Sequence, residues 1–563
     1  MSSFIFPDPA EPTPEITDLV SPLMNQLLVS RGITDSEAAK AWLEPDYDSQ
    51  LHAPELLNDI EPACVRIEKA MADCEQIAIF SDYDCDGIPG AVVLHDFFKA
   101  IKYVHFQNYI PHRHYEGFGL SNVAIDKLQK DGVKLIITID CGTTNVSEVT
   151  YAKEQGIDVI ITDHHEPGEK LPEAVAVVNP KLGTYPFPDL CGTATVFKLA
   201  QALLNRGSFG LTPGWEKWWL DMVGIATIAD MVPLVGENRV FAHYGLKVLR
   251  KSRRPGLQQL LKKAKADQRY LTEDDIGFTI GPRINAASRM DTPEDAFFML
   301  SETDLIKAVE RVEHLEKLNT DRKTQVALMT RDLHKRLKLL EEIPAVLVMG
   351  HNDWRPSLVG LAAAKLAEEH NRPVFLWGKD GNGVYKGSCR SGGGVSVVKL
   401  MQAVSEVFHE HGGHHVAGGF SIKDEHIFNF GEKLVAAMDK LGDTAVVAAE
   451  VIIDAEIKLE EVNELLIRQL NKLSPFGMGN PKPIFAFKNV TPQAVELFGK
   501  TKEHTKLIFQ IEQRKVEAIA FFQIPEQFTK TPAADSSCIM IGHVEQSFFM
   551  GRMQLRIRII DII

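Results

Sequence analysis

QIAIFSDYDCDGIPGAVVLHDFFKAI, residues 76–101, is the stretch that decides the fold. Four of its first five residues are apolar and two of these are β-branched, which predicts a buried strand. An acidic turn follows the strand, and the apolar positions of residues 89–101 then recur at helical spacing. The same order returns downstream, because the apolar runs 133–139 and 157–162 flank a helical pattern at 143–156. Short buried strands that alternate with helices predict a parallel sheet with helical crossovers.

The periodicity changes elsewhere and divides the chain into five parts. Residues 303–342 keep helical spacing with no Gly or Pro before Pro344, which predicts one long helix between two α/β domains. The last part, ending in MQLRIRIIDII, alternates at period two and predicts a small β-barrel or sandwich. The expected parts are an acidic N-terminal arm at 1–60, a first α/β domain at 61–302, the connecting helix at 303–342, a second α/β domain at 343–445 and a β-domain at 446–563.

The charge of the chain is unevenly distributed. Its 61 Lys and Arg against 76 Asp and Glu give a net charge of −15, which taken alone argues against a nucleic-acid binder. Residues 1–63, however, hold twelve of the acidic side chains and only two basic ones, whereas residues 247–269 hold nine basic side chains and one acidic. The total therefore does not exclude nucleic acid, and we expect the basic stretch to track its backbone outside the cleft.

Targeting and redox signals point to the cytoplasm. No stretch approaches the roughly 18 apolar residues of a membrane span, and the N-terminus lacks the basic and apolar regions of a signal peptide. The seven cysteines are widely spread and include no CxxC pair, which favours reduced thiols over a disulfide framework. We therefore expect a cytoplasmic protein with no membrane partner.

Acidic and histidine side chains gather directly after the predicted strands. They are Asp82, Asp84 and Asp86 after the first strand, Asp140 after the second, Asp163, His164 and His165 after the third, and Asp230 after the apolar helix or strand 224–229. Ligands bind at the carboxyl ends of strands in open parallel sheets, so the four groups are expected to converge on one crevice. Each aspartate taken singly is more typical of a helix N-cap, but four such groups together favour a functional site.

The chemistry of these side chains indicates a metal centre. Converging carboxylates repel one another in a dry cleft unless a cation neutralises them, and carboxylates with one or two imidazoles suit Mn²⁺ or Mg²⁺ better than zinc. The ligands suffice for two ions with a bridging carboxylate, an arrangement that catalyses in-line phosphoryl displacement by water. The sequence therefore predicts hydrolysis of a phosphoester or phosphoanhydride.

Two glycine-rich stretches of the second α/β domain have a different character. FHEHGGHHVAGGF, residues 408–420, carries four histidines around two glycine pairs, and KGSCRSGGG, residues 386–394, carries Ser388 and Arg390. Glycines let backbone N–H groups approach an anion closely, so both stretches favour binding of phosphate or of a nucleic-acid backbone. A zinc site at the histidines is the alternative, although no cysteine or paired spacing completes it.

These motifs resemble those of the DHH phosphoesterases. The segment 82–87, Asp140, the triplet 163–165 and Asp230 are similar to the four motifs of the DHH domain, and GGHHVAGGF is similar to the signature of the accompanying DHHA1 domain. Four further stretches narrow the resemblance to the RecJ family of bacterial single-strand-specific DNA exonucleases: PRINAASRM (282–290), WRPSLVGLAAAKL (354–366), GSCRS (387–391) and SPFGMGNPKPIF (474–485). The resemblance covers essentially residues 25–563.

The resemblance implies degradation of single-stranded DNA from its 5′ end, 5′ to 3′, to mononucleotides in recombination and repair, with two Mn²⁺ or Mg²⁺ ions. The implied metal ligands are Asp84, Asp86, Asp140, His164 and Asp230. His165 is expected to act in catalysis or contact the phosphate, Asp163 to orient an imidazole, and Asp82 to be a ligand or a neighbour of the ligands. The implied DNA and phosphate contacts are Arg113, Arg283, Arg289, Ser388, Arg390, Gly413 and His414.

The resemblance also implies partners and a C-terminal OB fold. A single-strand-binding protein and a helicase are the implied protein partners, and a monomer is expected. An OB fold binds single strands by stacking and charge, for which the candidate aromatics are Phe498, Phe521, Phe522, Phe548 and Phe549. Two other interpretations stay open: a DHH-family phosphoesterase acting on oligoribonucleotides, cyclic dinucleotides or pyrophosphate, and a non-catalytic DNA-binding scaffold.

Overall fold

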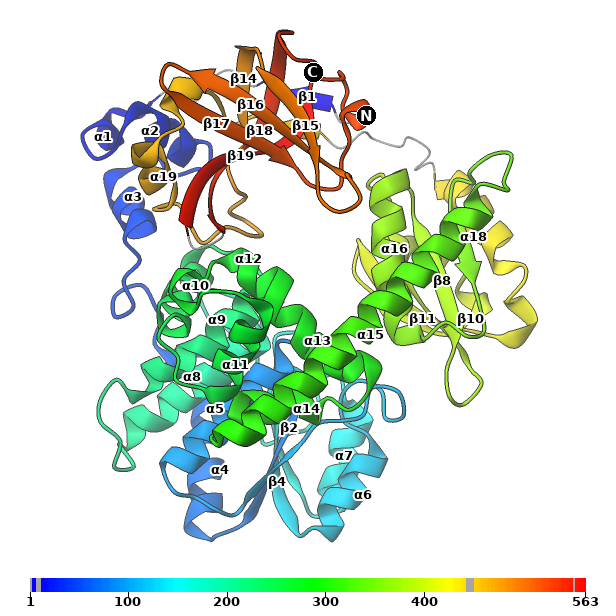
Figure 1. The fold of residues 1–563 in the computed structure, drawn as a ribbon. Helices are drawn as coiled ribbons and strands as arrows, with labels where there is room; N and C mark the ends of the chain where they lie inside the picture. The colour runs from blue at the N-terminus through cyan, green and yellow to red at the C-terminus, as the bar shows by residue number, and fades with distance from the viewer. Residues whose placement is uncertain (1–2, 7–11, 442–449, 550–551) are drawn as a thin grey trace.

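A computed structural model describes residues 3–6, 12–441, 450–549 and 552–563 of the chain. Figure 1 shows a first α/β domain, a second α/β domain reached through the long helix α15, and a β-rich C-terminal domain that faces the first. The expected boundary between the second α/β domain and the C-terminal domain, at 445 and 446, lies outside the described residues.

The first α/β domain is built on a five-stranded parallel sheet in the order β3-β2-β4-β5-β6. Its strands are β2 (Gln76–Ser81), β3 (Phe106–Tyr109), β4 (Val133–Ile139), β5 (Asp158–Thr162) and β6 (Ala176–Val178). Strand β2 is apolar on both faces, because Ile77 and Ile79 pack into one hydrophobic cluster and Ala78 and Phe80 into another.

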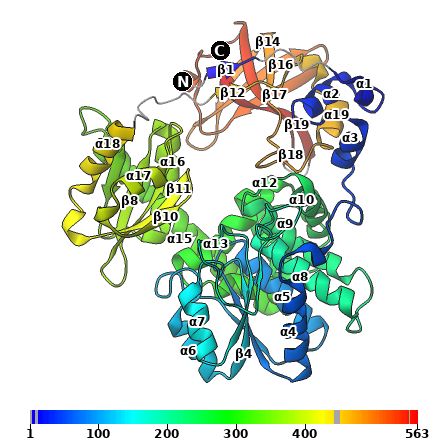
Figure 2. The same cartoon turned by 180° about the vertical axis from the view of Figure 1, so that it is seen from behind.

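Helices cover both faces of this sheet, as Figure 2 shows from behind. One side carries α4 (Ile60–Ala72), α5 (Gly87–Ala100) and α8 (Gly192–Arg206), and the other carries α6 (Asn122–Lys130) and α7 (Val146–Glu154). The acidic turn at 82–86 lies between β2 and α5, so it stands at the carboxyl edge of the sheet as predicted.

A group of helices completes the core of the first domain. They are α9 (Leu220–Ala229), α10 (Gly236–Leu249), α11 (Pro255–Ala264), α12 (Glu273–Asp275), α13 (Gly281–Met290) and α14 (Glu294–Ser301). Because 224–229 is helical, the expectation that all four acidic groups follow strands is wrong for Asp230, which ends α9. Helix α9 is buried nearly all round, and such a helix has no amphipathic period that would distinguish it from a buried strand.

The connecting helix is α15 (Leu305–Leu337). It begins at Asp304, whose carboxylate accepts hydrogen bonds from the amides of Ile306 and Lys307. Its first half buries Val312, Leu315 and Leu318 in the core of the first domain, and its second half buries Met329, Leu333 and Leu337 in the second. The helix is therefore a shared element of both cores, which fixes the two domains relative to each other.

The second α/β domain has a five-stranded sheet in the order β10-β11-β9-β8-β7. Its strands are β7 (Leu347–Gly350), β8 (Val374–Lys379), β9 (Tyr385–Arg390), β10 (Phe408–Gly413) and β11 (Ala417–Ile422), and its helices are α16 (Pro356–His370), α17 (Val397–Ala403) and α18 (Phe430–Leu441). The two glycine-rich stretches lie side by side in it, because Gly419 of β11 pairs with Ser388 of β9.

The C-terminal domain contains a seven-stranded sheet in the order β13-β14-β18-β19-β17-β16-β15. Its strands are β13 (Ala455–Glu456), β14 (Phe485–Val490), β15 (Ala494–Phe498), β16 (His504–Ile511), β17 (Arg514–Ala520), β18 (Cys538–Phe549) and β19 (Arg552–Ile562), with α19 (Glu464–Leu470) beside them.

The N-terminal segment is part of this C-terminal domain. Helices α2 (Pro22–Val29) and α3 (Ser36–Leu43) bury Leu27, Leu28 and Ala39 in the same core as Phe485 and Phe509. Strand β1 (Ser3–Ile5) pairs in parallel with β12 (Glu450–Ile452). Residues 16–43 of the expected arm therefore complete the C-terminal domain, because their apolar helix faces need a partner to be buried. Tyr47, Leu57 and Ile60 pack instead in the core of the first domain.

The predicted fold class is confirmed: two α/β domains joined by a long helix, followed by a β-rich domain. Among the residues that the structure describes, no helix has the length and apolar character needed to cross a membrane.

Candidate metal centre and phosphate-binding cleft

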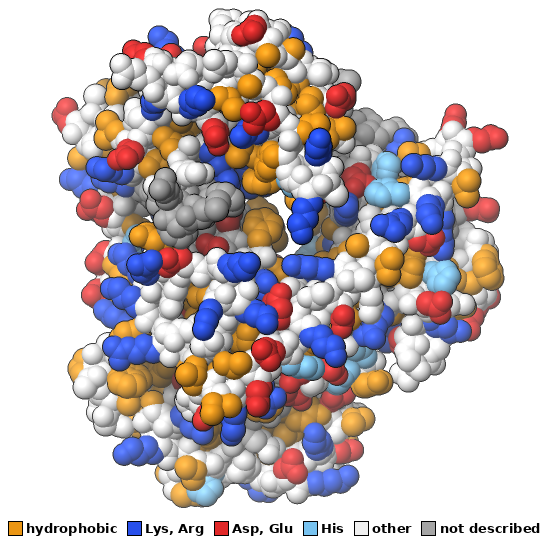
Figure 3. Space-filling model, viewed as in Figure 1, with side chains coloured by type: hydrophobic (Ala, Val, Ile, Leu, Met, Phe, Trp, Pro, Cys, Tyr) orange, Lys and Arg blue, Asp and Glu red, His pale blue; other side chains and the backbone are white. Residues whose placement is uncertain are grey.

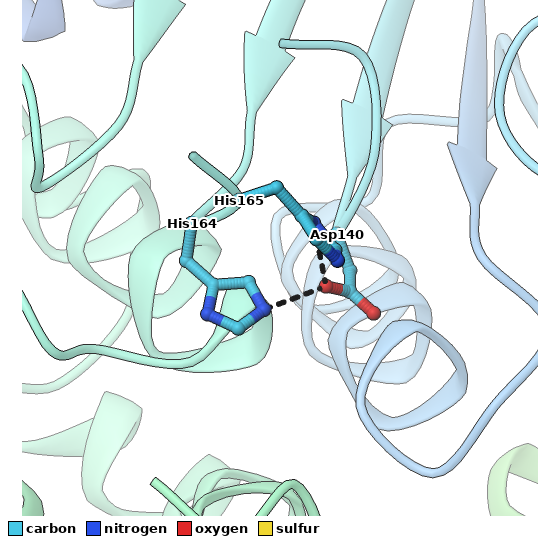
Figure 4. Close-up of side chains that lie close together, drawn as sticks. All are labelled: Asp140, His164 and His165. Atoms are coloured by element: carbon cyan, nitrogen blue, oxygen red, sulfur yellow. Dashed lines mark ion pairs between the residues drawn. The ribbon is translucent and has the colours of Figure 1, made fainter. Parts of the chain in front are cut away.

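The predicted acidic groups converge at the carboxyl edge of the first sheet. Strands β2, β4 and β5 are neighbours in that sheet, so the residues that follow them meet at one place. Figure 4 shows Asp140, which follows β4, beside the rings of His164 and His165, which follow β5. Asp140 adopts a left-handed backbone conformation with φ 60°, an uncommon geometry for a non-glycine residue that is typical of functional sites.

The imidazole of His164 stands among three carboxylates. Its Nε2 lies 3.1 Å from Oδ1 of Asp140, 3.7 Å from Oδ2 of Asp86 and 3.7 Å from Oδ2 of Asp230. Asp86, His164 and Asp230 can each offer one ligand atom within 4.8 Å of the others. Asp230, at the end of helix α9, thus lies beside Asp86 and His164, which follow strands β2 and β5.

A second set of possible ligands adjoins the first. Asp82, Asp84 and Asp140 also offer atoms that all lie within 4.8 Å of one another, and so do Asp140, His164 and His165. Asp140 lies 3.1 Å from His164 of the first set, so it stands between the two. This arrangement suits a pair of adjacent cations with Asp140 between them.

The electrostatics of the carboxylate group favour a cation. Burial, followed by the neighbouring carboxylates, raises the pKa of Asp82 and Asp140 well above the usual range, and the same causes raise the pKa of Asp230 to about 9. The Oδ1 atoms of Asp82 and Asp140 are buried and accept no hydrogen bond. Buried oxygens of this kind are costly unless a ligand satisfies them, and oxygen donors with an imidazole match Mn²⁺ or Mg²⁺. The residues therefore fit a divalent cation.

The N-terminus of α8 holds one of the carboxylates. Asp86 accepts hydrogen bonds from the amides of Gly192 (2.6 Å) and Thr193 (2.8 Å), the first residues of that helix. Position 192 must be glycine for this contact, because a Cβ there would lie 2.6 Å from the Cβ of Asp140. The sequence analysis missed Gly192, which carries no acidic or basic signal and belongs to no quoted motif.

Asp163 orients His165. Its Oδ1 accepts a hydrogen bond from Nδ1 of His165 at 2.7 Å, and its Oδ2 accepts one from the amide of Thr143 at 2.9 Å. Burial alone would raise the pKa of Asp163, but these bonds lower it below the usual range; burial alone would lower the pKa of His165, but Asp163 raises it. The pairing places the proton on Nδ1 and leaves Nε2 for a substrate.

A cleft of about 430 Å³ lies beside the metal centre and has one wall from each α/β domain. The first domain contributes Tyr83, Arg113 and His114, and the second contributes Lys386 and Ser388 together with other residues of β9, β10 and β11. The guanidinium carbon of Arg113 lies 4.8 Å from the centre of the Tyr83 ring. The cleft thus joins the acidic turn of one domain to the glycine-rich strands of the other.

Three arginines gather near this cleft without an acidic partner. Burial, then the charge of Arg113 and other arginines including Arg390, lowers the pKa of Arg289 to about 9; the pKa of Arg390 is lowered by burial and by Arg113. Among the described residues, no carboxylate lies within ion-pair distance of any of the three. Buried like charges destabilise one another until an anion binds, so this cluster is suited to a phosphate group.

Comparison with known proteins gives a consistent result. Residues 76–227 match the DHH family, N-terminal domain; residues 343–444 match the DHHA1 domain; residues 453–561 match the RecJ OB domain. The single-stranded-DNA-specific exonuclease RecJ of Salmonella typhimurium is 30% identical over 494 residues, which cover 84% of this chain and 85% of that protein. The chain belongs to the RecJ family.

Other relatives of the RecJ family agree. The RecJ of Bacillus subtilis is 35% identical over 510 residues, and the match covers 89% of this chain but 63% of that longer protein. A crystal structure of RecJ in complex with Mn²⁺ from Thermus thermophilus superposes with a TM-score of 0.82 at 26% identity, covering all of this chain and 79% of that one.

One expected phosphate contact of this RecJ family member, Arg283, forms an ion pair within the protein. Arg283 is not among the residues that line the cleft, because its guanidinium donates to both carboxylate oxygens of Glu316 on α15 and to the carbonyl of Thr279. This bidentate ion pair holds α13 against α15, and the phosphate contact expected of Arg283 stays a prediction.

The hairpin of β10 and β11 carries the remaining expected contacts. Gly413 ends β10 with φ 137°, and the amide of His414 donates to the carbonyl of Ala417 in the tight turn that follows. The charge of His414 contributes to lowering the pKa of Glu166, after the larger effect of Lys181. The turn therefore lies near Glu166, the residue that follows His165 in the chain. No group of metal-binding geometry among the described residues includes the histidines of this hairpin, which leaves the zinc alternative without support.

The basic stretch 247–269 is used in part within the protein. Arg254 is buried between Asp96 and Asp221, Arg250 donates to the carbonyl of Leu271, and Arg269 pairs with Asp267. Figure 3 shows Lys and Arg side chains interspersed with Asp and Glu on the face that carries α10, α11 and α12. The expected backbone track stays a prediction for the remaining lysines.

The aromatic candidates of the OB domain form a cluster around His504. The rings of Phe498, Phe521 and Phe522 lie 5.0, 5.5 and 4.7 Å from its ring, and Phe522 is 76% exposed. The side chains of Phe548 and Phe549 lie outside the described residues. Base stacking on the first three residues stays a prediction.

Proposed function

We propose that the protein is a metal-dependent exonuclease that degrades single-stranded DNA from its 5′ end to mononucleotides, in recombination and repair. The observation that carries this proposal is that two unneutralised clusters of opposite charge, one of carboxylates and one of arginines, lie close together. Buried carboxylates that need cations lie near part-buried arginines that need an anion, and a cleft lined by Tyr83 and Arg113 lies beside both clusters. A phosphodiester with bound divalent cations would satisfy both clusters at once, and the curated relatives that match most of this chain are named single-stranded-DNA-specific exonucleases.

Two Mn²⁺ or Mg²⁺ ions would be held at the acidic cluster, as the Thermus thermophilus structure with Mn²⁺ supports for a relative. Asp86, His164 and Asp230 form one set of ligands, and Asp82, Asp84 and Asp140 form the other, with Asp140 shared. Bound ions would supply an activated water and stabilise the oxygens of the displaced phosphodiester. The raised pKa values of the carboxylates mean that the cations would displace protons on binding.

His165 would hold a proton against the substrate phosphate. Its Nδ1–H is fixed by Asp163, so Nε2 is directed to the open side of the site, where the ring is about one-third exposed. The raised pKa of His165 favours the form that carries a proton on Nε2 as well. That proton can stabilise charge on a non-bridging oxygen or pass to the leaving oxygen.

The polarity would follow from the arginine cluster. Arg113, Arg289 and Arg390, with the hydroxyl of Ser388, are suited to a terminal 5′ phosphate, because charge-assisted bonds favour a group with more negative charge than an internal phosphodiester. A strand anchored there by its 5′ end would place the first phosphodiester next to the adjacent metal centre. The two walls of the cleft come from different domains that α15 holds together, which would restrict entry to one strand.

A single-strand-binding protein and a helicase would be the partners, and we propose a monomer acting in the cytoplasm. A helicase would supply the free 5′ end that the cleft needs, and a single-strand-binding protein would compete for or present the strand. Co-sedimentation of the purified chain with each candidate tests this part of the proposal, and a chain that sediments alone with both would refute it.

The substrate panel tests the whole proposal. The protein with Mn²⁺ is incubated with single-stranded DNA labelled at the 5′ or the 3′ end, duplex DNA, oligoribonucleotide and pyrophosphate. We expect labelled mononucleotide at once from the 5′-labelled single strand, and progressively shorter strands from the 3′-labelled one. Preferred hydrolysis of the small or ribonucleotide substrates would indicate the phosphoesterase alternative, and binding of DNA without hydrolysis would indicate the scaffold.

A further inference from the structure

The segment that carries Asp230 touches the C-terminal domain directly. Residues 230–235 join α9 to α10, and four residues after Asp230 the amide of Leu234 donates a 2.7 Å hydrogen bond to the carbonyl of Met478. Met478 belongs to the loop 474–482, which precedes β14. The loop also approaches Pro233, because a Cβ on Gly479 would lie 3.2 Å from the Cβ of Pro233.

The segment 230–235 depends on such outside support. Met231 has a left-handed backbone with φ 60°, and its side chain is 65% exposed, so its own packing does not stabilise this conformation. Unfavourable backbone conformations persist only where surrounding contacts determine them. Asn238 supplies one such contact, since its side-chain amide donates to the carbonyls of Pro233 (3.1 Å) and Asp189 (2.6 Å).

The loop 474–482 is itself rigid. Gly477 and Asn480 exchange backbone hydrogen bonds of 2.9 and 3.1 Å. The side-chain amide of Asn480 is buried and donates to the carbonyls of Leu473 (2.8 Å) and Pro475 (2.9 Å). Because these bonds hold the loop in one shape, a shift of the C-terminal domain would move the loop and the residues that contact it.

Arg239 fastens the loop to the catalytic domain. Its guanidinium, on α10, is buried and donates to the carbonyls of Lys472, Leu473 and Ser474, and it also donates to the carbonyl of Trp42 in the N-terminal segment. One side chain of the catalytic domain therefore satisfies carbonyls from two other parts of the chain. Removing any of these segments would leave buried polar groups without partners.

We propose that the loop 474–482 is a positioning element for Asp230, so that the C-terminal domain sets the affinity of the Asp86–His164–Asp230 site for its cation. The inference rests on the metal assignment in the proposed function. It gives the C-terminal domain a role at the metal centre that is separate from any contact of that domain with DNA. The loop acts on the cation through Asp230 and touches neither cation nor substrate.

Three glycine variants separate the contact from general destabilisation. Gly477→Ala adds a Cβ 2.8 Å from Cδ1 of Leu234 at a position without positive φ, and Gly479→Ala adds both a contact with Pro233 and the strain of φ 72°. Gly32→Ala is the matched control, because Gly32 has a similar φ of 76° but nothing within 4 Å of its Cβ. The difference between these two variants and the control therefore reports the effect of displacing residues 233–235.

The readout is Mn²⁺ binding to the full chain without DNA, measured by calorimetry, with the midpoint of thermal unfolding measured in parallel. We expect two classes of site in the unmodified protein. In Gly477→Ala and Gly479→Ala one class weakens roughly tenfold, as for disturbed neighbours of metal ligands, while Gly32→Ala binds both ions as the unmodified protein does. Equal Mn²⁺ affinity in all four proteins would overturn the inference while leaving the proposed function intact.

Hydrogen exchange provides a test that needs no variant. Binding coupling is reciprocal, so Mn²⁺ must stabilise the loop contact if the loop stabilises the Mn²⁺ site. We expect Mn²⁺ to slow amide exchange in 474–482 and at Leu234, and to leave the β15–β16 turn of the same domain unchanged. Unchanged exchange in the loop at saturating Mn²⁺ would overturn the inference, whereas a chain that binds no Mn²⁺ would overturn the proposed function itself.

Discussion

Two clusters beside the cleft differ in the sign of the charge that they leave unneutralised. The first gathers buried carboxylates around His164 and Asp140, whereas the second gathers the guanidinium groups of Arg113 and Arg289 from the first domain and of Arg390 from the second. Each cluster is unfavourable by itself, since like charges in a low dielectric repel one another. We propose that ligands complete both clusters: cations bind the carboxylates, and a phosphate binds the arginines.

The largest effect is expected at the residue shared by both metal sites. Asp140→Ala should reduce hydrolysis of single-stranded DNA at least about a thousandfold, because metal ions supply several kcal/mol of transition-state stabilisation. DNA binding should stay detectable, since the arginines are untouched. Exposed Asp131→Ala is the control and should keep full activity. Substantial hydrolysis by the Asp140 variant in a gel assay would refute the assignment of Asp140 as a metal ligand.

The arginine cluster is tested by its preference for a terminal phosphate. Arg113→Met should raise KM for 5′-phosphorylated single strands by about 10–100-fold, the value of a lost charge-assisted hydrogen bond. The loss for strands with a 5′ hydroxyl should be smaller. Arg206→Met removes an exposed arginine paired with Glu61 and Glu68 and should change neither substrate. Equal losses on both substrates would show that Arg113 does not recognise the strand end.

The pair of Asp163 and His165 lies beside the carboxylate cluster, with Nδ1 of His165 3.8 Å from Oδ1 of Asp140. Asp163→Asn removes the charge that raises the pKa of His165, so kcat should fall about tenfold. The acidic limb of the pH profile reports the metal ligands, and the alkaline limb should move to lower pH because His165 loses its proton earlier. His165→Asn combined with Asp163→Asn should lose no more than His165→Asn alone. An unshifted alkaline limb would place the proton donor elsewhere.

The carboxylates of the metal centre should also make the stability of the protein depend on pH. The folded pKa of Asp230 is raised to about 9, so the metal-free protein is favoured by protonation at low pH and loses that stability as pH rises towards 9. Bound Mn²⁺ replaces these protons. The increase in Tm caused by Mn²⁺ should therefore be a few degrees larger at pH 8.5 than at pH 6. An increase independent of pH would contradict the raised carboxylate pKa values.

Much of this architecture follows from the sequence because its signals are local. The buried strands and helices around residues 76–162 have clear periods, and the aspartates that end β2 and β4 lie where parallel topology places them. The ligand atoms of Asp82, Asp84 and Asp140 meet for that reason.

The rest depends on contacts between distant segments. Arg283 has the same local signal as Arg289, but only the fold brings Glu316 to it. The acidic composition of residues 1–60 predicts an arm, but the apolar residues of 16–43 complete the core of the C-terminal domain and those of 47–60 join the core of the first. Gly192 and the loop that contacts Leu234 carry no chemical signal of their own, since their importance is steric.

We propose that two cations bind the carboxylate cluster of the first α/β domain, with Asp140 between them. Anomalous diffraction from crystals soaked in Mn²⁺ measures this directly. The account predicts two peaks in the first α/β domain, both next to Asp140, one near Asp82 and Asp84 and the other near His164 and Asp230. A single peak away from Asp140, or peaks only at the histidines of the β10–β11 hairpin, would contradict it.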